Sequence, residues 1–83
     1  MSLVKIALNS YVQASEIKLI TVYEGRGIIN HIKELRKTNK VVDLTKGKKT
    51  LCVIYLMDGT AILINSAPET ITKRIEEGES DAS

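Results

Sequence analysis

The stretch LCVIYLMDGTAILI, residues 51–64, decides the fold of this chain. Every residue from Leu51 to Met57 is apolar, which is typical of a strand that is covered on both of its faces. Asp58 and Gly59 supply a predicted two-residue turn, and the apolar run from Ala61 to Ile64 returns antiparallel to the first strand. The sequence therefore predicts a buried β-hairpin at the centre of the molecule.

Further strand-like segments lie upstream of this hairpin and extend it into a sheet. They are rich in aliphatic and β-branched residues and are bounded by polar or glycine-containing breaks. We expect a strand at Leu3–Leu8 with a short hairpin partner at Tyr11–Gln13, a longer strand at Ile17–Tyr23, and a short strand at Val41–Leu44.

Two segments have the periodicity of helices. Ile28, Ile32 and Leu35 form one apolar stripe, which predicts an amphipathic helix of about three turns. Asn39 is the expected left-handed residue after its C-terminal end. The second helix is predicted to start at the capping box Ser66-Ala67-Pro68-Glu69 and to end at Gly78.

The predicted fold is therefore α+β, a small and mostly antiparallel sheet with two helices, in a single domain at residues 1–78. Residues 79–83 form a predicted disordered acidic tail. Two helices of this length are too few to cover both faces of the sheet, so roughly several hundred Å² of apolar surface stays exposed on a monomer. We interpret this surface as the interface of a homo-oligomer.

The charges of the chain are polarised along the sequence. The formal net charge is only +2 and the isoelectric point is about 8.8. Residues 26–49, however, contain eight basic side chains and two acidic ones, a local net charge of +6. Such a basic middle attracts phosphate groups more strongly than the mean charge suggests, although a solvated helix face gives the same pattern.

The composition offers little for catalysis or metal binding. Cys52 is the only cysteine and His31 the only histidine, so we expect no disulfide, no metal site within one chain, and no cofactor. The sequence predicts neither a signal peptide nor a membrane span, and the chain is expected to be cytoplasmic. No positioned pair of catalytic carboxylates is evident, so an enzyme is not expected.

The stretch VDLTKGKKT, residues 42–50, is the predicted binding element. Gly47 permits a tight bend, and Lys46, Lys48 and Lys49 carry three cations with no acidic residue inside the turn. The spacing is not that of a Walker A loop. We expect these lysines to contact the phosphates of duplex DNA, assisted by the Thr50 hydroxyl and by Lys18 on the third strand, while Asp43 pairs with a lysine of the turn.

From Tyr11 to Ile75 the chain resembles the RemA and RemB family of small bacterial DNA-binding regulators of extracellular matrix (biofilm) genes. The resemblance rests on the segments YVQASEIKLI, GIINHIKELRK, VVDLTKGKKT and AILINSAPETITKRI. It implies a non-enzymatic transcription regulator that assembles into a ring-like homo-oligomer. Lys48 and Lys49 stand where the family has an arginine pair, whereas Glu16 and Leu51 stand where it has basic residues.

Two other functions fit the same sequence. The first is a structural or protein-interaction module in which the basic turn only maintains solubility. The second is an RNA-binding module, which the absence of Phe and Trp disfavours because single-stranded bases usually stack on aromatic side chains. Lysines without arginine in the turn favour backbone contact over the reading of base sequence.

Overall fold

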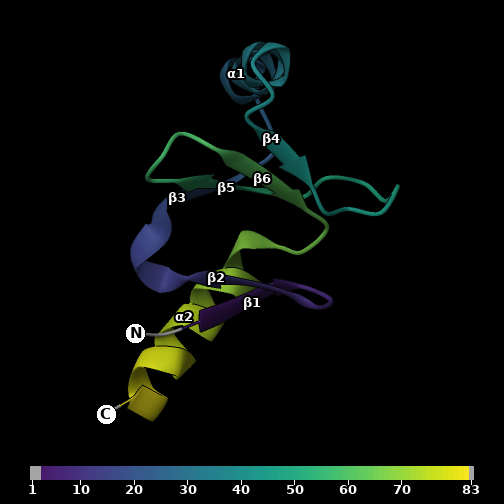
Figure 1. The fold of residues 1–83 in the computed structure, drawn as a ribbon. Coiled ribbons are helices and arrows are strands. Elements are labelled where there is room, and N and C mark those ends of the chain that lie inside the picture. The colour runs from purple at the N-terminus through teal and green to yellow at the C-terminus, as the bar shows by residue number, and fades with distance from the viewer. Residues whose placement is uncertain (1–2, 83) are drawn as a thin grey trace.

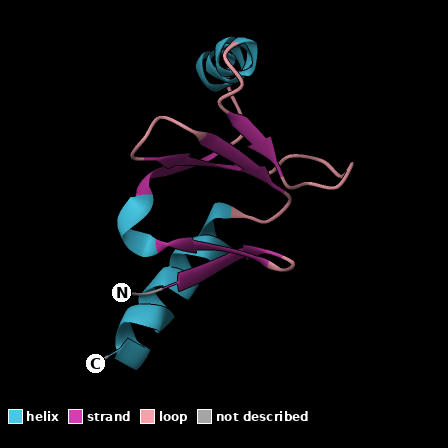
Figure 2. Cartoon of the chain, in the orientation of Figure 1, coloured by secondary structure: helices cyan, strands magenta, loops and turns pink. Residues whose placement is uncertain are grey.

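The computed structural model describes residues 3–82, and it confirms the α+β class (Figures 1 and 2). The strands and helices follow closely the segments predicted from periodicity. They are β1 (Leu3–Ala7), β2 (Ser10–Gln13), β3 (Ile17–Val22), α1 (Arg26–Lys37), β4 (Val41–Asp43), β5 (Cys52–Leu56), β6 (Ala61–Ile64) and α2 (Pro68–Ala82), with a 3-10 turn at Ala14–Glu16.

The strands form two separate sheets. β1 and β2 make an antiparallel hairpin, and the other strands form a four-stranded sheet in the order β3-β5-β6-β4. The pairs β3–β5 and β5–β6 are antiparallel, whereas β4 runs parallel to β6. The predicted central hairpin is thus confirmed, with β3 and β4 as the edge strands of the larger sheet.

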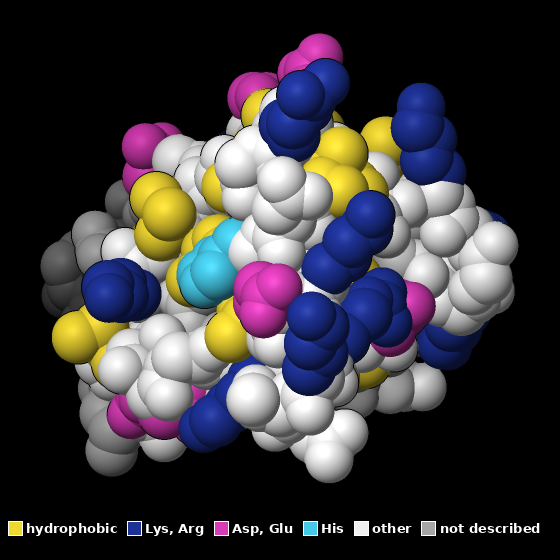
Figure 3. Space-filling view, turned by 90° about the horizontal axis from the view of Figure 1, so that it is seen from above, with side chains coloured by type: hydrophobic (Ala, Val, Ile, Leu, Met, Phe, Trp, Pro, Cys, Tyr) yellow, Lys and Arg dark blue, Asp and Glu magenta, His cyan; other side chains and the backbone are white. Residues whose placement is uncertain are grey.

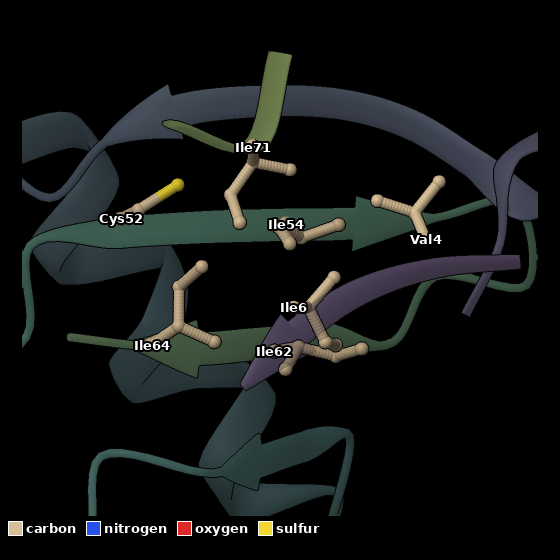
Figure 4. Packing of buried hydrophobic residues seen from close by; sticks show 7 residues of the cluster. All are labelled: Val4, Ile6, Cys52, Ile54, Ile62, Ile64 and Ile71. Carbon is tan, nitrogen blue, oxygen red and sulfur yellow. The ribbon is translucent and has the colours of Figure 1, made fainter. Parts of the chain in front are cut away.

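Three layers explain why strand β5 is apolar on both faces. Figure 1 shows α1 on one side of the four-stranded sheet and the β1–β2 hairpin with α2 on the other. Val53 and Tyr55 pack with Ile32 of α1, while Cys52 and Ile54 face the opposite layer. Figure 4 shows this second core, to which β1, β5, β6 and α2 contribute the side chains of Val4, Ile6, Cys52, Ile54, Ile62, Ile64 and Ile71.

The N-terminal hairpin corrects the expectation of an uncovered sheet. Two helices alone are indeed too few for both faces, but the hairpin supplies the missing cover, and residues from Cys52 to Tyr55 and from Ala61 to Ile64 are buried. The large apolar side chains that stay exposed lie mainly on edge strands, in the hairpin and in loops: Leu3, Leu8, Tyr11, Leu19, Val22, Val42, Leu51 and Met57. Whether they form an interface between subunits stays a prediction.

Two details of the predicted connections are wrong. The β5–β6 loop has three residues, not two, because Leu56 N–H donates to the Thr60 carbonyl at 2.8 Å and only Gly59 has a positive φ, of 92°. This is the common three-residue hairpin with glycine in the left-handed position. The polarity pattern cannot separate the two loop types, since Asp-Gly suits both.

The boundaries of the second helix also differ from prediction. Helix α2 begins at Pro68, and among the described residues no hydrogen bond joins Ser66 to Glu69, so the capping box is wrong. The helix continues through Gly78 to Ala82. A glycine costs a helix only about 1 kcal/mol relative to alanine, which does not by itself end it. Helix α1 ends as predicted, with Asn39 at φ 58°.

Candidate nucleic-acid interface

The basic loop, residues 44–51, lies at the end of the four-stranded sheet where β4 and β6 finish (Figure 1). Because β4 and β5 flank β6, the loop has to cross the end of β6 to connect them. It is fastened there by backbone hydrogen bonds of 2.9 Å from Leu44 N–H to the Leu63 carbonyl and from Leu51 N–H to the Ile64 carbonyl. The Asn65 side-chain amide donates to the Lys49 carbonyl.

Inside the loop, a tight turn presents the lysines. Lys48 N–H donates to the Thr45 carbonyl at 3.1 Å, and the two residues between them, Lys46 and Gly47, have φ values of 55° and 83°. Two successive positive φ angles are those of a type I′ turn. Glycine adopts this conformation freely, but a lysine adopts it at a cost of roughly 1 kcal/mol or more. The backbone strain at Lys46 lies at the exposed tip of the loop.

Asp43 holds the start of the loop through Thr45. Its Oδ1 accepts hydrogen bonds from the Thr45 hydroxyl at 2.6 Å and from the Thr45 N–H at 2.9 Å. These two bonds, with a smaller contribution from the nearby Arg36 guanidinium, hold the pKa of the Asp43 carboxyl below its usual value. The predicted pairing of Asp43 with a lysine is wrong, since among the described residues only Lys37 and Glu34 form an ion pair. The Asp43 carboxylate binds the buried Thr45 instead. The Asp-x-Thr spacing is the sequence signal from which such a turn could have been predicted.

The three lysines of the loop are electrostatically unneutralised. Lys46, Lys48 and Lys49 are all exposed, and in the described part of the chain the one ion pair joins Lys37 and Glu34 at 3.3 Å. A lysine ammonium is a strong hydrogen-bond donor on a flexible stem, so the turn presents three donors of the type that contact phosphate oxygens in other proteins.

A shallow groove of about 200 Å³ adjoins the loop. Its lining includes Lys46 and Lys48 of the basic loop, Ala7 at the end of β1, and Leu8 of the turn that follows. Lys49 and the half-buried Thr50 do not line this groove. The structure thus brings the loop next to the N-terminal hairpin, a neighbour that the sequence did not predict.

Comparison with known proteins places the whole chain in a family of regulators. A family model described as "RemA-like: Extracellular matrix regulatory protein A-like" matches residues 3–75. The chain belongs to the RemA-like family. It is 33% identical over 81 residues to a "Putative regulatory protein" of Dictyoglomus thermophilum, covering 98% of this chain and 95% of the relative. A relative with a similar name in Bacillus cytotoxicus is 34% identical over 79 residues, which are 95% of this chain and 91% of that protein.

The predicted site residues of this RemA-like chain do not all lie together. Lys46, Lys48, Lys49 and Thr50 share one loop, whereas Lys18 follows Ile17, which pairs with Leu56 at the opposite end of β5. Five residues of strand separate the two ends by roughly 17 Å. Lys18 therefore belongs to a different part of the surface from the basic loop.

Other cations accompany the loop on the α1 side of the molecule. Figure 3 looks onto this side and shows several Lys and Arg side chains gathered around the helix. Arg36 of α1 is close enough to Asp43 to influence its carboxyl group, so the helix and the start of the loop are electrostatic neighbours. Sequence reasoning placed Arg36 only at the end of a helix, because the α1–β4 packing is a tertiary contact.

The other residues considered for catalysis or metal binding, Cys52 and His31, have environments that are typical of structural roles. Cys52 is fully buried, and burial together with the charge of Glu69 raises the pKa of its thiol to about 11. His31 stacks on Tyr55 with ring centroids 5.3 Å apart. Among residues 3–82, no three potential ligands of the His, Cys, Asp and Glu types gather at one place. Neither helix in that range is long and apolar enough to cross a membrane.

Proposed function

We propose that this protein is a non-enzymatic transcription regulator that holds duplex DNA by its phosphate backbone through Lys46, Lys48, Lys49 and Thr50. The observation that carries the proposal is a loop fastened to the end of β6 that displays three lysines without carboxylate partners among the described residues. Membership in the RemA-like family, and the regulatory names of the relatives, support the regulatory part.

The chemistry of the loop favours contact with the backbone over the reading of bases. Lysine presents a point charge, whereas bidentate recognition of guanine needs the planar fork of arginine, which the loop lacks. The loop is also too short to enter a groove as a helix or a β-ribbon does. Its role is then to fix the position of DNA, with affinity that depends strongly on salt.

Repetition of the loop in a homo-oligomer strengthens this binding. Single phosphate contacts are weak, but several copies on one assembly act together through a high effective concentration. The open edges of β3 and β4, together with the exposed Val22 and Val42, provide apolar surface for contact between subunits. We propose a ring-like assembly in the cytoplasm, where the DNA of a bacterial cell is found.

The test is a salt series of binding to duplex DNA of random sequence, measured by fluorescence anisotropy. Each neutralised phosphate contributes about −0.9 to the slope of log affinity against log salt concentration. The double variant Lys48→Ala, Lys49→Ala is expected to bind more weakly and to lose about 1.8 of that slope. The control is Lys5→Ala, Lys73→Ala, which removes the same charge from exposed positions on β1 and α2.

The outcomes separate the alternatives. An unchanged slope in the loop variant, or an equal loss in the control, would remove the loop from the binding surface. Wild-type protein that binds no DNA near physiological salt would instead favour the protein-interaction module. Tighter binding of single-stranded RNA than of duplex DNA would favour the RNA-binding module.

A further inference from the structure

A second hollow lies between α1 and the edge of the sheet, away from the basic loop. It has a volume of about 400 Å³ and is lined by residues of α1, of β3, and of β5 with its following turn. A single helix of 12 residues packs over β4, β6 and the near part of β5, so it leaves the β3 margin of this face open. Leu19, opposite Tyr55 in the sheet, is consequently 49% exposed.

The walls of this hollow are aliphatic. Leu19, Ile28, Leu35 and Leu56 form them, and Figure 3 shows hydrophobic surface directly beside the histidine. Its size lies near the lower end of the range of small-molecule sites, which are mostly apolar with a few polar groups. The hollow is therefore an open depression with the mostly apolar lining that is typical of a ligand site.

Its polar groups are a hydrogen-bonded pair and one cation. His31 Nδ1 lies 3.1 Å from the Tyr55 hydroxyl, and burial raises the pKa of that hydroxyl above its ordinary value of 10.0. If Nδ1 accepts this bond, Nε2 carries a proton; if Nδ1 donates it, the tyrosine proton is free. With either tautomer, one N–H or O–H of the His31–Tyr55 pair is free to donate a hydrogen bond to a ligand. Lys18 adds a positive charge.

Within the described part of the chain no carboxylate lines the hollow. Glu16 is exposed beside one end of it, where its backbone carbonyl accepts a hydrogen bond from Met57 N–H at 2.8 Å. Glu34 pairs with Lys37 at 3.3 Å, and Asp58 accepts a hydrogen bond from the Thr60 N–H at 2.9 Å. The charge of the site is thus complementary to an anion. Aliphatic walls with a cation and a donor fit a molecule that has an apolar body and one anionic head.

We propose that this hollow, formed by α1, β3 and β5, binds a small amphiphilic carboxylate. The hydrocarbon part packs on Leu19, Ile28 and Leu35, and the carboxylate accepts hydrogen bonds from Lys18 and from the His31–Tyr55 pair. This site does not depend on the proposed binding of DNA.

The probe is octanoate, compared with octan-1-ol, which has the same chain and no charge. Heteronuclear NMR of the full-length protein is expected to show saturable shifts of the amides of Lys18, Leu19 and Gly59 with octanoate. Calorimetry is expected to show weaker binding of the alcohol. Lys18→Met, which keeps the apolar stem, should weaken octanoate by roughly threefold to fivefold, as expected for an exposed ion pair, and leave the alcohol unchanged.

Two variants control the interpretation. Lys5→Met removes an exposed lysine from β1, outside the hollow, and should leave both affinities as in the wild type. Leu19→Ala removes part of the wall at an exposed position and should weaken both ligands, by about threefold. Equal affinities for octanoate and octanol, shifts elsewhere on the surface, or no saturable shift because a second copy of the chain covers the hollow would each overturn the proposal.

Discussion

The two loops that flank strand β5 share a turn motif but differ in the side chains that they present. Before β5, Asp43 accepts a hydrogen bond from the Thr45 N–H at 2.9 Å, and Gly47 has a φ of 83°. After β5, Asp58 accepts one from the Thr60 N–H at the same distance, and Gly59 has a φ of 92°. Both loops combine an Asp-x-Thr sequence with a left-handed glycine.

The two loops differ in length and in the number of exposed lysines. The loop after β5 connects adjacent antiparallel strands and needs only three residues, Met57 to Gly59. The loop before β5 crosses the end of β6 and contains three exposed lysines near its turn. Turn chemistry therefore explains why both loops are ordered, whereas only the lysines indicate binding. Variants made in matched pairs separate these two contributions.

The largest effect is expected from replacing the glycines. Gly47→Ala and Gly59→Ala each force an alanine into the left-handed region, which costs about 1–2 kcal/mol of unfolding free energy in both loops. Steric contact adds nothing, because a Cβ at either position would meet no atom of the described residues within 4 Å. Urea denaturation measures the loss of stability, and DNA titration at constant salt measures binding.

Only Gly47→Ala is expected to weaken DNA binding, since it alters the turn that presents the lysines. Gly59→Ala is the control for a general loss of stability. An equal loss of affinity in both variants would show that binding follows overall stability and not the basic loop. Gly27 of α1 also has open space where a Cβ would stand, and its φ is not positive, so Gly27→Ala should be neutral or stabilising.

Local pattern was sufficient for most of the secondary structure. The apolar run from Leu51 to Met57 predicted a strand covered on both faces, and the stripe of Ile28, Ile32 and Leu35 predicted α1. The sequence did not show that the β1–β2 hairpin covers the second face of the sheet, because that packing joins Val4 and Ile6 to residues far along the chain. The expectation of exposed apolar surface was wrong for the residues from Cys52 to Tyr55 and from Ala61 to Ile64 for this reason, whereas Leu51 and Met57 of the same run are exposed.

The candidate site, like the fold, was predictable from the sequence only where its residues lie close together in the chain. The lysines of the basic loop are close together in sequence, so a short motif was enough to select them. Lys18 was grouped with them by charge alone, and strand register places it at the other end of β5. The hollow between α1 and β3 leaves no sequence motif, since its lining comes from three separate segments.

The second prediction concerns the carboxylates of the two loops. Asp43→Ala removes two hydrogen bonds to Thr45 and leaves a buried hydroxyl without its acceptor, which should cost about 1 kcal/mol. Asp58→Ala removes a bond to a less buried threonine and should cost less. Asp43→Asn keeps an acceptor for the Thr45 N–H without the charge, so it should retain the loop conformation and bind DNA more tightly than wild type.

The acid response of wild type and Asp43→Asn tests the role of these hydrogen bonds. The folded-state pKa of Asp43 lies below its ordinary value of 3.8. Its stabilising contribution is therefore complete above about pH 4 and is lost as the pH falls through the folded-state pKa. Denaturation midpoints should fall less steeply below about pH 4 in Asp43→Asn than in wild type. Parallel curves for the two proteins would mean that the Asp43–Thr45 bonds contribute no stability.

The smallest expected effect has the opposite sign and is the most specific to function. Lys46 occupies the left-handed region at φ 55°, so Lys46→Gly relieves backbone strain, while the added freedom of the unfolded chain offsets part of the gain. We expect a net stabilisation of about 0.5 kcal/mol in urea denaturation, together with weaker DNA binding and a salt slope reduced by about 0.9. If Lys46 served mainly to stabilise the turn, the variant would be less stable than wild type. If Lys46 serves to contact DNA, the variant is more stable and binds DNA more weakly. Lower stability with unchanged binding would therefore show that Lys46 supports the turn and does not contact DNA.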